Sequence, residues 1–126
     1  MTQDAFCWVS IPATDIDRAQ RFYETLLACS LQRQQNGPQT IALFPSGEGR
    51  VGGGLFHGPG VPAPSTDGPI AYVQARPSID VVLARAGELG ATVLMPKFEL
   101  PGGAGIIAQI VDSEGNRLGL WAPAAA

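Results

Sequence analysis

The hydrophobic and polar positions of this chain follow two different periods that alternate along its length. Between residues 16 and 27 apolar side chains recur at steps of three and four, the period of an α-helix with one buried face. Thr14 or Asp15 can cap this helix, and Asp17 lies in the first turn, where the helix dipole favours a carboxylate. The pattern therefore predicts a helix that packs on a sheet through Ile16, Ala19, Phe22, Tyr23, Leu26 and Leu27.

Short segments rich in β-branched and aromatic residues, separated by turn residues, surround this helix and predict strands. In the first half these segments are residues 6–12, 31–35, 40–44 and 50–56. After a Gly- and Pro-rich stretch, further segments of the same kind cover residues 70–75, 91–99, 105–112 and 117–123. A second helix, capped by Ser78 and closed by Gly90, follows the first of them. Each half has the order strand, helix, three strands.

The two halves form an internal repeat. Ile79 follows Ile16 by 63 residues, and the same offset maps Trp8 onto Ala71. A unit of about 60 residues buries too small a fraction of its surface to be stable by itself, so we expect the two halves to pack together. We predict one domain over residues 1–126, with module one at about 5–56, a linker at about 57–69 and module two at about 70–123. The expected fold class is α+β, with tandem βαβββ modules whose curved mixed sheets share a concavity.

Strand alternation separates the side chains that face the helices from those that face the concavity. If Val9 and Ile11 pack under the first helix, Trp8 and Ser10 point the other way. By the same rule Trp121 points away from its two leucine neighbours on the last strand. We expect both tryptophans to face the concavity, where they either pack as part of a core or form a stacking platform for a planar ligand.

Three segments carry a resemblance to a known family. They are WVSIPATDIDRAQRFY at 8–23, GATV at 90–93 and DSEGNRLGLW at 112–121. In this order around a βαβββ duplication, the chain resembles the glyoxalase/bleomycin-resistance/dioxygenase superfamily, also called vicinal oxygen chelate, over essentially its whole length. The resemblance implies the paired-module fold and assembly as a homodimer.

Metal-dependent members of that superfamily carry His, Glu or Gln ligands on inward-facing strand positions. Those positions fall here on Trp8, on Gly53 or Gly54, on Ala71 and on Gly119. Indole, methyl and hydrogen side chains offer no lone pair to a divalent cation at about 2.0–2.2 Å. We therefore expect neither a metal nor another cofactor.

A glycine-rich stretch, VGGGLFHGPG at 51–60, lies beside a formal G-x-G-x-x-G match at Gly47, Gly49 and Gly52. A dinucleotide site needs a helix at the end of this motif, and the following glycines forbid one, so we interpret SGEG as a hairpin turn. Glycines inside a strand indicate a curved sheet, a bulge, room for a ligand, or room for a large neighbour such as Trp8 or Trp121.

Composition excludes several classes of partner. The net charge is −3, with 8 basic and 11 acidic residues scattered along the chain, so no footprint for nucleic acid is present. No apolar run approaches the roughly 20 residues that span a bilayer, and the N-terminus resembles no secretory signal. We expect a cytoplasmic protein without a membrane partner. Cys7 and Cys29 form no C-x-x-C, and we expect no disulfide between them.

The candidate ligand-binding residues are Trp8, Ser10, His57, Glu99 and Trp121. His57 is either a loop residue, part of a pocket rim or a proton carrier. Glu48, Glu99 and Glu114 fall in or near predicted turns or strand ends and are expected on a solvated face, although Glu99 could lean over the concavity. The first hypothesis is a metal-free protein that binds a small planar or apolar molecule. One alternative is a lyase, isomerase or dioxygenase whose metal is held by non-standard ligands such as His57 and Glu99. The other is a dimeric interaction module with a filled concavity; no catalytic residue is assigned.

Overall fold

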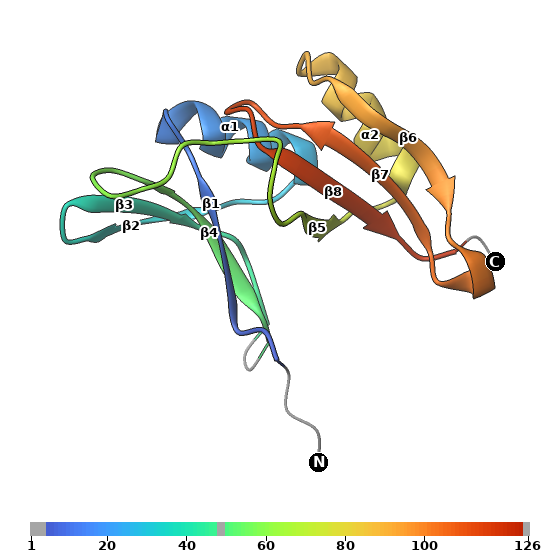
Figure 1. The fold of residues 1–126 in the computed structure, drawn as a ribbon, viewed down its shortest axis with the longest axis horizontal. Coiled ribbons are helices and arrows are strands. Elements are labelled where there is room, and N and C mark those ends of the chain that lie inside the picture. Colours follow the sequence, from blue (N-terminus) through green and yellow to red (C-terminus); the bar gives the residue numbers. More distant parts are fainter. Residues whose placement is uncertain (1–4, 48–49, 125–126) are drawn as a thin grey trace.

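A computed structural model describes residues 5–47 and 50–124 and confirms the order strand, helix, three strands in each half (Figure 1). Module one consists of β1 (Trp8–Pro12), α1 (Ile16–Leu27), β2 (Gln32–Asn36), β3 (Gln39–Leu43) and β4 (Gly52–His57). Module two consists of β5 (Ala71–Gln74), α2 (Ile79–Glu88), β6 (Val93–Glu99), a 3-10 turn η1 (Pro101–Gly103), β7 (Ile106–Val111) and β8 (Arg117–Ala122).

Each module forms a four-stranded mixed sheet, which confirms the α+β class and the tandem βαβββ topology. The strand orders are β1-β4-β3-β2 and β5-β8-β7-β6. In both sheets the first strand of the module pairs parallel with the last strand, and the other neighbours pair antiparallel. A parallel first strand is possible because the helix supplies the crossover connection.

The helices begin and end where their capping residues predict. The Asp15 carboxylate accepts a hydrogen bond from the Arg18 backbone N–H at 3.1 Å, which selects Asp15 over Thr14 as the N-cap of α1. The Ser78 hydroxyl accepts from the Val81 N–H at the start of α2. Gly90, with φ of 76°, follows the C-cap of α2 in the left-handed region that glycine favours.

One face of each sheet packs under its helix and forms the core. The buried strand residues on this face include Ile11, Leu55, Ile110, Leu118 and Leu120. The two helices contact each other, so they lie on the same side of the molecule (Figure 1). We call the opposite face of each sheet, which carries no helix, its open face.

The internal repeat has different offsets in its helices and its strands. The helices are 63 residues apart, as predicted, but the first strands of the two modules, β1 and β5, are 62 apart. Equivalent backbone bonds show this offset: Ala13 and Ala75 each donate their N–H to the last strand of their module, to the carbonyls of Phe56 and Trp121. Module two therefore has one extra residue between strand and helix. The counterpart of Trp8 is Ile70, and the predicted equivalence with Ala71 is wrong.

Three smaller expectations can be compared with the structure. Gly52 begins strand β4, so no helix follows the G-x-G-x-x-G match; Glu48 and Gly49 of its predicted turn lie outside the described residues. Cys7 and Cys29 are both free thiols. Across residues 5–47 and 50–124, no helix has the length and apolar character needed to cross a bilayer.

Candidate functional site

The open face of module one carries a tryptophan that lies flat over glycines. Trp8 pairs with Gly52, and Ser10 pairs with Gly54. A Cβ atom added to Gly52 would lie 3.3 Å from Cζ3 of the indole, and one added to Gly54 would lie 3.5 Å from Cζ2. The indole Nε1 donates to the Ser10 hydroxyl oxygen at 2.9 Å. Of the explanations that the sequence left open for the glycine run, room for a large neighbour is the one observed at these two glycines.

Gly53 has a different role from its neighbours. A Cβ at this position would lie 2.7 Å from the Val9 carbonyl oxygen, on the helix side of the sheet. The first module's open-face position in the family pattern is therefore Gly54, which resolves the choice between Gly53 and Gly54.

The open face of module two repeats this arrangement with other aromatic residues. Tyr72 pairs with Gly119, and a Cβ at Gly119 would overlap the tyrosine ring. Likewise, a Cβ at Gly105 would overlap the indole of Trp121, whose Nε1 donates to the Ala104 carbonyl at 3.0 Å. Both modules thus place an aromatic ring against the backbone where glycine leaves room. Tyr72 was not among the residues predicted from the sequence.

A chain of hydrogen bonds holds the Tyr72 hydroxyl. Nε of Arg117 donates to the Thr66 carbonyl in the linker at 2.9 Å, and its Nη1 donates to Oε1 of Gln109 at 2.8 Å. Nε2 of Gln109 then donates to the Tyr72 hydroxyl oxygen at 2.7 Å. Gln109 is buried, whereas Tyr72 is 44% exposed, so the chain runs from the interior to the open face.

The remaining predicted residues lie elsewhere. His57 lies on the same face of β4 as the fully buried Leu55, and its Nδ1 donates to the Ala13 carbonyl at 2.9 Å, since a carbonyl oxygen can only accept. Glu99 pairs with Ile106, which packs against the core, so Glu99 lies at the helix-side edge of β6. Phe98, which pairs with Ile107, lies on the open face instead. Neither His57 nor Glu99 joins the tryptophans.

The space between the two modules of one chain is a separate feature. A cavity of about 520 Å³ lies between β1, the linker, β5 and β8, and its apolar wall includes Val9, Ile11 and Leu118. A second cavity of about 180 Å³ is lined by residues that include Val9 and Gly53. These side chains belong mainly to the helix-facing set. Among the predicted ligand residues only Ser10 borders the larger cavity, and the two tryptophans line neither.

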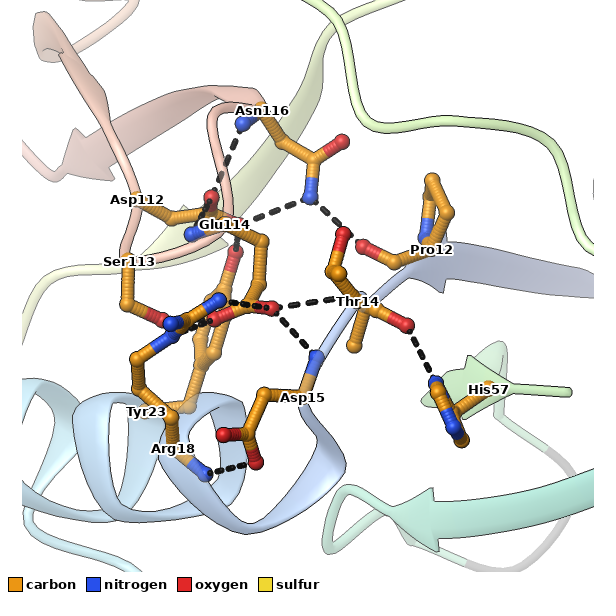
Figure 2. A network of polar contacts seen from close by, with 11 residues as sticks. Pro12, Thr14, Asp15, Arg18, Tyr23, His57, Asp112, Ser113, Glu114 and Asn116 are labelled. Atoms are coloured by element: carbon orange, nitrogen blue, oxygen red, sulfur yellow. Dashed lines mark hydrogen bonds and ion pairs between the residues drawn. The ribbon is translucent and has the colours of Figure 1, made fainter.

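A polar cluster joins the turn between β7 and β8 to module one (Figure 2). We call residues 112–116, together with their partners in residues 12–23, the clasp. The Tyr23 hydroxyl donates to Oδ2 of Asp112 at 2.5 Å, and Nδ2 of Asn116 donates to the Pro12 carbonyl at 2.8 Å. Every one of these bonds connects the second module to the first.

Glu114 lies at the centre of the clasp, contrary to its expected place in a solvated turn. Its side chain is fully buried and accepts from the backbone N–H groups of Thr14 and Asp15 at 2.9 and 2.8 Å. Nε of Arg18 donates to its other oxygen at 2.7 Å. The turn composition suggested that Glu114 is exposed. Its carboxylate is buried because it accepts hydrogen bonds from backbone N–H groups before α1 that have no partner within the helix.

Glu114 and Tyr23, both buried in the clasp, have shifted pKa values. Burial alone would raise the pKa of Glu114, but the hydrogen bonds from Arg18, Asp15 and Ser113 outweigh it and lower that pKa to about 2. Burial and the neighbouring Asp112 charge raise the pKa of Tyr23 well above its ordinary value. At neutral pH Glu114 is ionised and Tyr23 is neutral. Because these groups satisfy one another, the clasp is suited to joining modules rather than to chemistry on a ligand.

The metal site of the family pattern does not fit this chain. The corresponding positions are Trp8, Gly54, Ile70 and Gly119, and none has a side chain with an oxygen or imidazole donor. Within the described ranges, no group of three His, Cys, Asp or Glu side chains lies close enough together to hold a metal ion.

Comparison with solved structures finds the same fold in several proteins. A glyoxylase/bleomycin resistance protein/dioxygenase domain from Frankia sp. EAN1pec matches with a TM-score of 0.69 and 22% identity, covering 98% of this chain and 93% of that one. The trypanothione-dependent glyoxalase I of Leishmania major matches with a TM-score of 0.69 and 18% identity, over 95% of this chain and 87% of that one. Glyoxalase I from Zea mays matches with a TM-score of 0.63 and 22% identity, over 92% of this chain and 45% of that one.

Sequence comparison gives the family. No curated protein matches the chain at a significant level. The family model described as Glyoxalase/Bleomycin resistance protein/Dioxygenase superfamily matches residues 5–120, from before β1 to the middle of β8, and this range includes the clasp. The chain therefore belongs to the Glyoxalase/Bleomycin resistance protein/Dioxygenase superfamily.

Proposed function

We propose that this protein binds a small, planar and largely apolar molecule on its open faces without the help of a metal ion. The observation that carries this proposal is the placement of aromatic rings on glycine. Trp8 and Tyr72 are 46% and 44% exposed, yet each is held against the backbone and fixed by a hydrogen bond. A rigid, half-exposed ring is suited to stacking, because little conformational entropy is lost when a ligand binds.

We further propose that the binding unit is a homodimer. One chain offers two half-sites, Trp8 and Ser10 on module one and Tyr72 and Trp121 on module two. Large apolar side chains remain exposed in the single chain, among them Phe6, Trp8, Val51, Tyr72 and Phe98. Exposed apolar surface of this kind favours a partner. Superfamily members often form dimers, and a second copy placed with its module two opposite module one would enclose a ligand between the two aromatic faces.

The enzymatic alternative has less support from the geometry. It required His57 and Glu99 as metal ligands, but both lie on the helix side of their strands, and Nδ1 of His57 donates to a carbonyl. The alternative of a filled interaction module is less favoured too, since the rings are half exposed.

Titration of the purified protein with naphthalene, monitored by tryptophan fluorescence, tests the proposal. We expect saturable quenching, and Trp8→Ala should weaken binding about three- to tenfold, the loss expected for one stacked pair. Val81→Ala removes another exposed apolar side chain, on α2 and away from the open faces, and serves as the control. Equal affinity in wild type and Trp8→Ala would refute stacking on Trp8. About one equivalent of Zn, Ni, Mn or Fe after dialysis would contradict metal-free binding.

Sedimentation velocity of the same protein over a range of concentrations tests the dimer. We expect a dimer whose dissociation constant rises in Phe98→Ser, because Phe98 is an exposed open-face residue. A monomer at every concentration, with naphthalene still bound, would remove the dimer from the proposal and leave the ligand site on single faces.

A further inference from the structure

We infer that the Tyr72 hydroxyl is a directed hydrogen-bond donor that selects, among planar ligands, those with a carbonyl oxygen attached to the ring system. The inference rests on the proposed function, because it concerns ligands held on the open face of module two. It assigns a specificity role to a residue that the sequence patterns did not indicate.

The direction of each hydrogen bond in the chain behind Tyr72 follows from what each group can do. A guanidinium has donors only, so the Gln109 atom that faces Arg117 must be the amide oxygen. The amide nitrogen of Gln109 is thereby turned toward Tyr72, and because that nitrogen can only donate, the phenolic oxygen must accept. The hydroxyl hydrogen of Tyr72 is consequently not used in this bond. No other residue in the described ranges accepts it.

Arg117, the first residue in this series of hydrogen bonds, is held in place as well. Arg117 cannot turn away from Gln109 without breaking the bond from its Nε to the Thr66 carbonyl. Gln109 is 9% exposed, so reversing its amide would leave a nearly buried group without a suitable partner. The protein therefore maintains Tyr72 as an acceptor on its inner side and a donor on its outer side.

The other two aromatic rings cannot fill this role. The indole Nε1 of Trp8 already donates to Ser10, and that of Trp121 already donates to the Ala104 carbonyl. An indole has a single N–H and no acceptor, so both rings present only their apolar surfaces. Of the three rings, Tyr72 alone has a polar hydrogen left for a ligand.

The position of the ring makes the donor directional. The ring lies against Gly119, where even a Cβ would overlap it, so it cannot sink further toward the sheet. With the ring and the oxygen both held, the O–H bond can only rotate about the C–O axis into the exposed side of the open face. A carbonyl oxygen on a ligand that stacks beside Tyr72 is the matching acceptor, whereas an apolar group at that place leaves the hydroxyl dependent on water.

An isosteric pair of probes measures this selectivity. In 2-acetylnaphthalene a carbonyl oxygen occupies the place that a methylene group takes in 2-isopropenylnaphthalene. Affinities of the wild-type protein for both should be determined by tryptophan fluorescence, and their ratio compared with the ratio in Tyr72→Phe. We expect the ratio to shift about three- to tenfold against the carbonyl compound in the variant, as the loss of one hydrogen bond requires. Affinity for 2-isopropenylnaphthalene should change less than about twofold, because the ring is retained.

A second variant tests the direction of the bond without removing the hydroxyl. In Gln109→Glu, the introduced carboxylate accepts from both Arg117 and Tyr72, which turns the phenolic hydrogen inward. The carbonyl preference should be lost here as in Tyr72→Phe, although the hydroxyl is still present.

The outcomes separate the inference from the function on which it rests. If both probes bind and the ratio is the same in wild type and Tyr72→Phe, the inference is wrong while planar-ligand binding stands. If Tyr72→Phe loses the preference but Gln109→Glu keeps it, the hydroxyl contributes without the direction inferred here, and the directed-donor argument is overturned. If neither probe binds wild type, the proposed function fails and the inference fails with it.

Discussion

The clasp and the open faces use polar and aromatic groups in opposite ways. In the clasp, Tyr23 is fully buried and donates its hydroxyl hydrogen to Asp112. On the open face of module two, Tyr72 is 44% exposed and its hydroxyl accepts from Gln109. The hydroxyl hydrogen of Tyr23 is thus used in a bond within the protein, whereas that of Tyr72 is available to a ligand.

This difference separates stability from recognition. The clasp joins segments about 100 residues apart in the chain and its polar groups bond to one another, so its loss should reduce stability. The open-face rings lie on glycine and pack little protein beneath them, so their loss should reduce binding. Variants of the two regions test whether stability and binding separate in this way.

The largest effect is expected for Asp112→Ala. The Asp112 carboxylate accepts from Tyr23, Asn116 and two backbone N–H groups, and its removal leaves several buried donors unpaired. We expect the free energy of unfolding to fall by about 3 kcal/mol or more, measured by urea denaturation. Asp67→Ala, at an exposed linker position, is the control. A loss below about 1 kcal/mol would show that the clasp is not the main joint between the modules.

A pH dependence of stability is expected from Glu114. Its folded pKa of about 2 lies below the ordinary value of 4.5, so its stabilisation is present above pH 4.5 and is lost as the pH falls toward 2. We expect a contribution on the order of 2 kcal/mol, reduced from the full shift because Arg18 is half exposed. Unfolding free energies of wild type and Glu114→Gln should converge below pH 3, whereas Glu88→Gln on α2 should follow wild type. Parallel curves for wild type and Glu114→Gln would contradict this assignment.

The glycines beneath the rings should differ in their tolerance of a methyl group. Gly119→Ala must displace the Tyr72 ring, and we expect it to cost about 1–3 kcal/mol and to abolish the preference for 2-acetylnaphthalene. At Gly52 a Cβ would lie 3.3 Å from the indole of Trp8, so Gly52→Ala should change stability by less than about 1 kcal/mol. Thermal denaturation and the probe titration measure the two effects. Equal tolerance at both positions would mean that the Tyr72 ring moves freely.

A modest effect on stability is expected for Trp8→Ala. Buried tryptophans cost about 3–5 kcal/mol on truncation, but Trp8 is 46% exposed, so we expect a loss below about 2 kcal/mol. The same variant should lose affinity for naphthalene. A loss of about 3–5 kcal/mol without loss of affinity would mean that Trp8 belongs to the core. The open face of module one would then contribute to stability, as the clasp does, rather than to binding.

Much of the fold could be predicted from the sequence, because hydrophobic periods and capping residues act locally. The α1 bounds, the Ser78 cap and the separation of Trp8 from Ile11 follow from spacing alone. The one-residue insertion between β5 and α2 could not be seen in the sequence. The apolar spacing that revealed the repeat lies in the helices, so it gives the distance between the helices but not that between the strands. Glu99 was misplaced because its expected role rested only on its position late in β6, and the pairing with Ile106 that puts it on the helix side is not visible in the sequence.

The site was less predictable, because its contacts join residues that are distant in sequence. Gly119 and Tyr72 are both visible in the sequence, but only the parallel pairing of β5 with β8 places the ring over the glycine. An offset of 62 would have aligned Tyr72 with Ser10 and drawn attention to it. The alternating acidic and amide residues of the last turn, Asp112, Glu114 and Asn116, were the signal for the clasp.

The clasp also constrains the order in which the chain can fold during translation. Glu114 is made 100 residues after Thr14, whose N–H it accepts, and Asp112 is made 89 residues after Tyr23. At ribosomal rates of about 5–20 residues per second, module one waits on the order of 5–20 seconds for these partners. The N-caps of both helices, in contrast, are local, because Asp15 and Ser78 each accept from an N–H three residues further on. The nascent first module therefore depends on the last hairpin to finish, and the chain completes its fold as one unit rather than module by module.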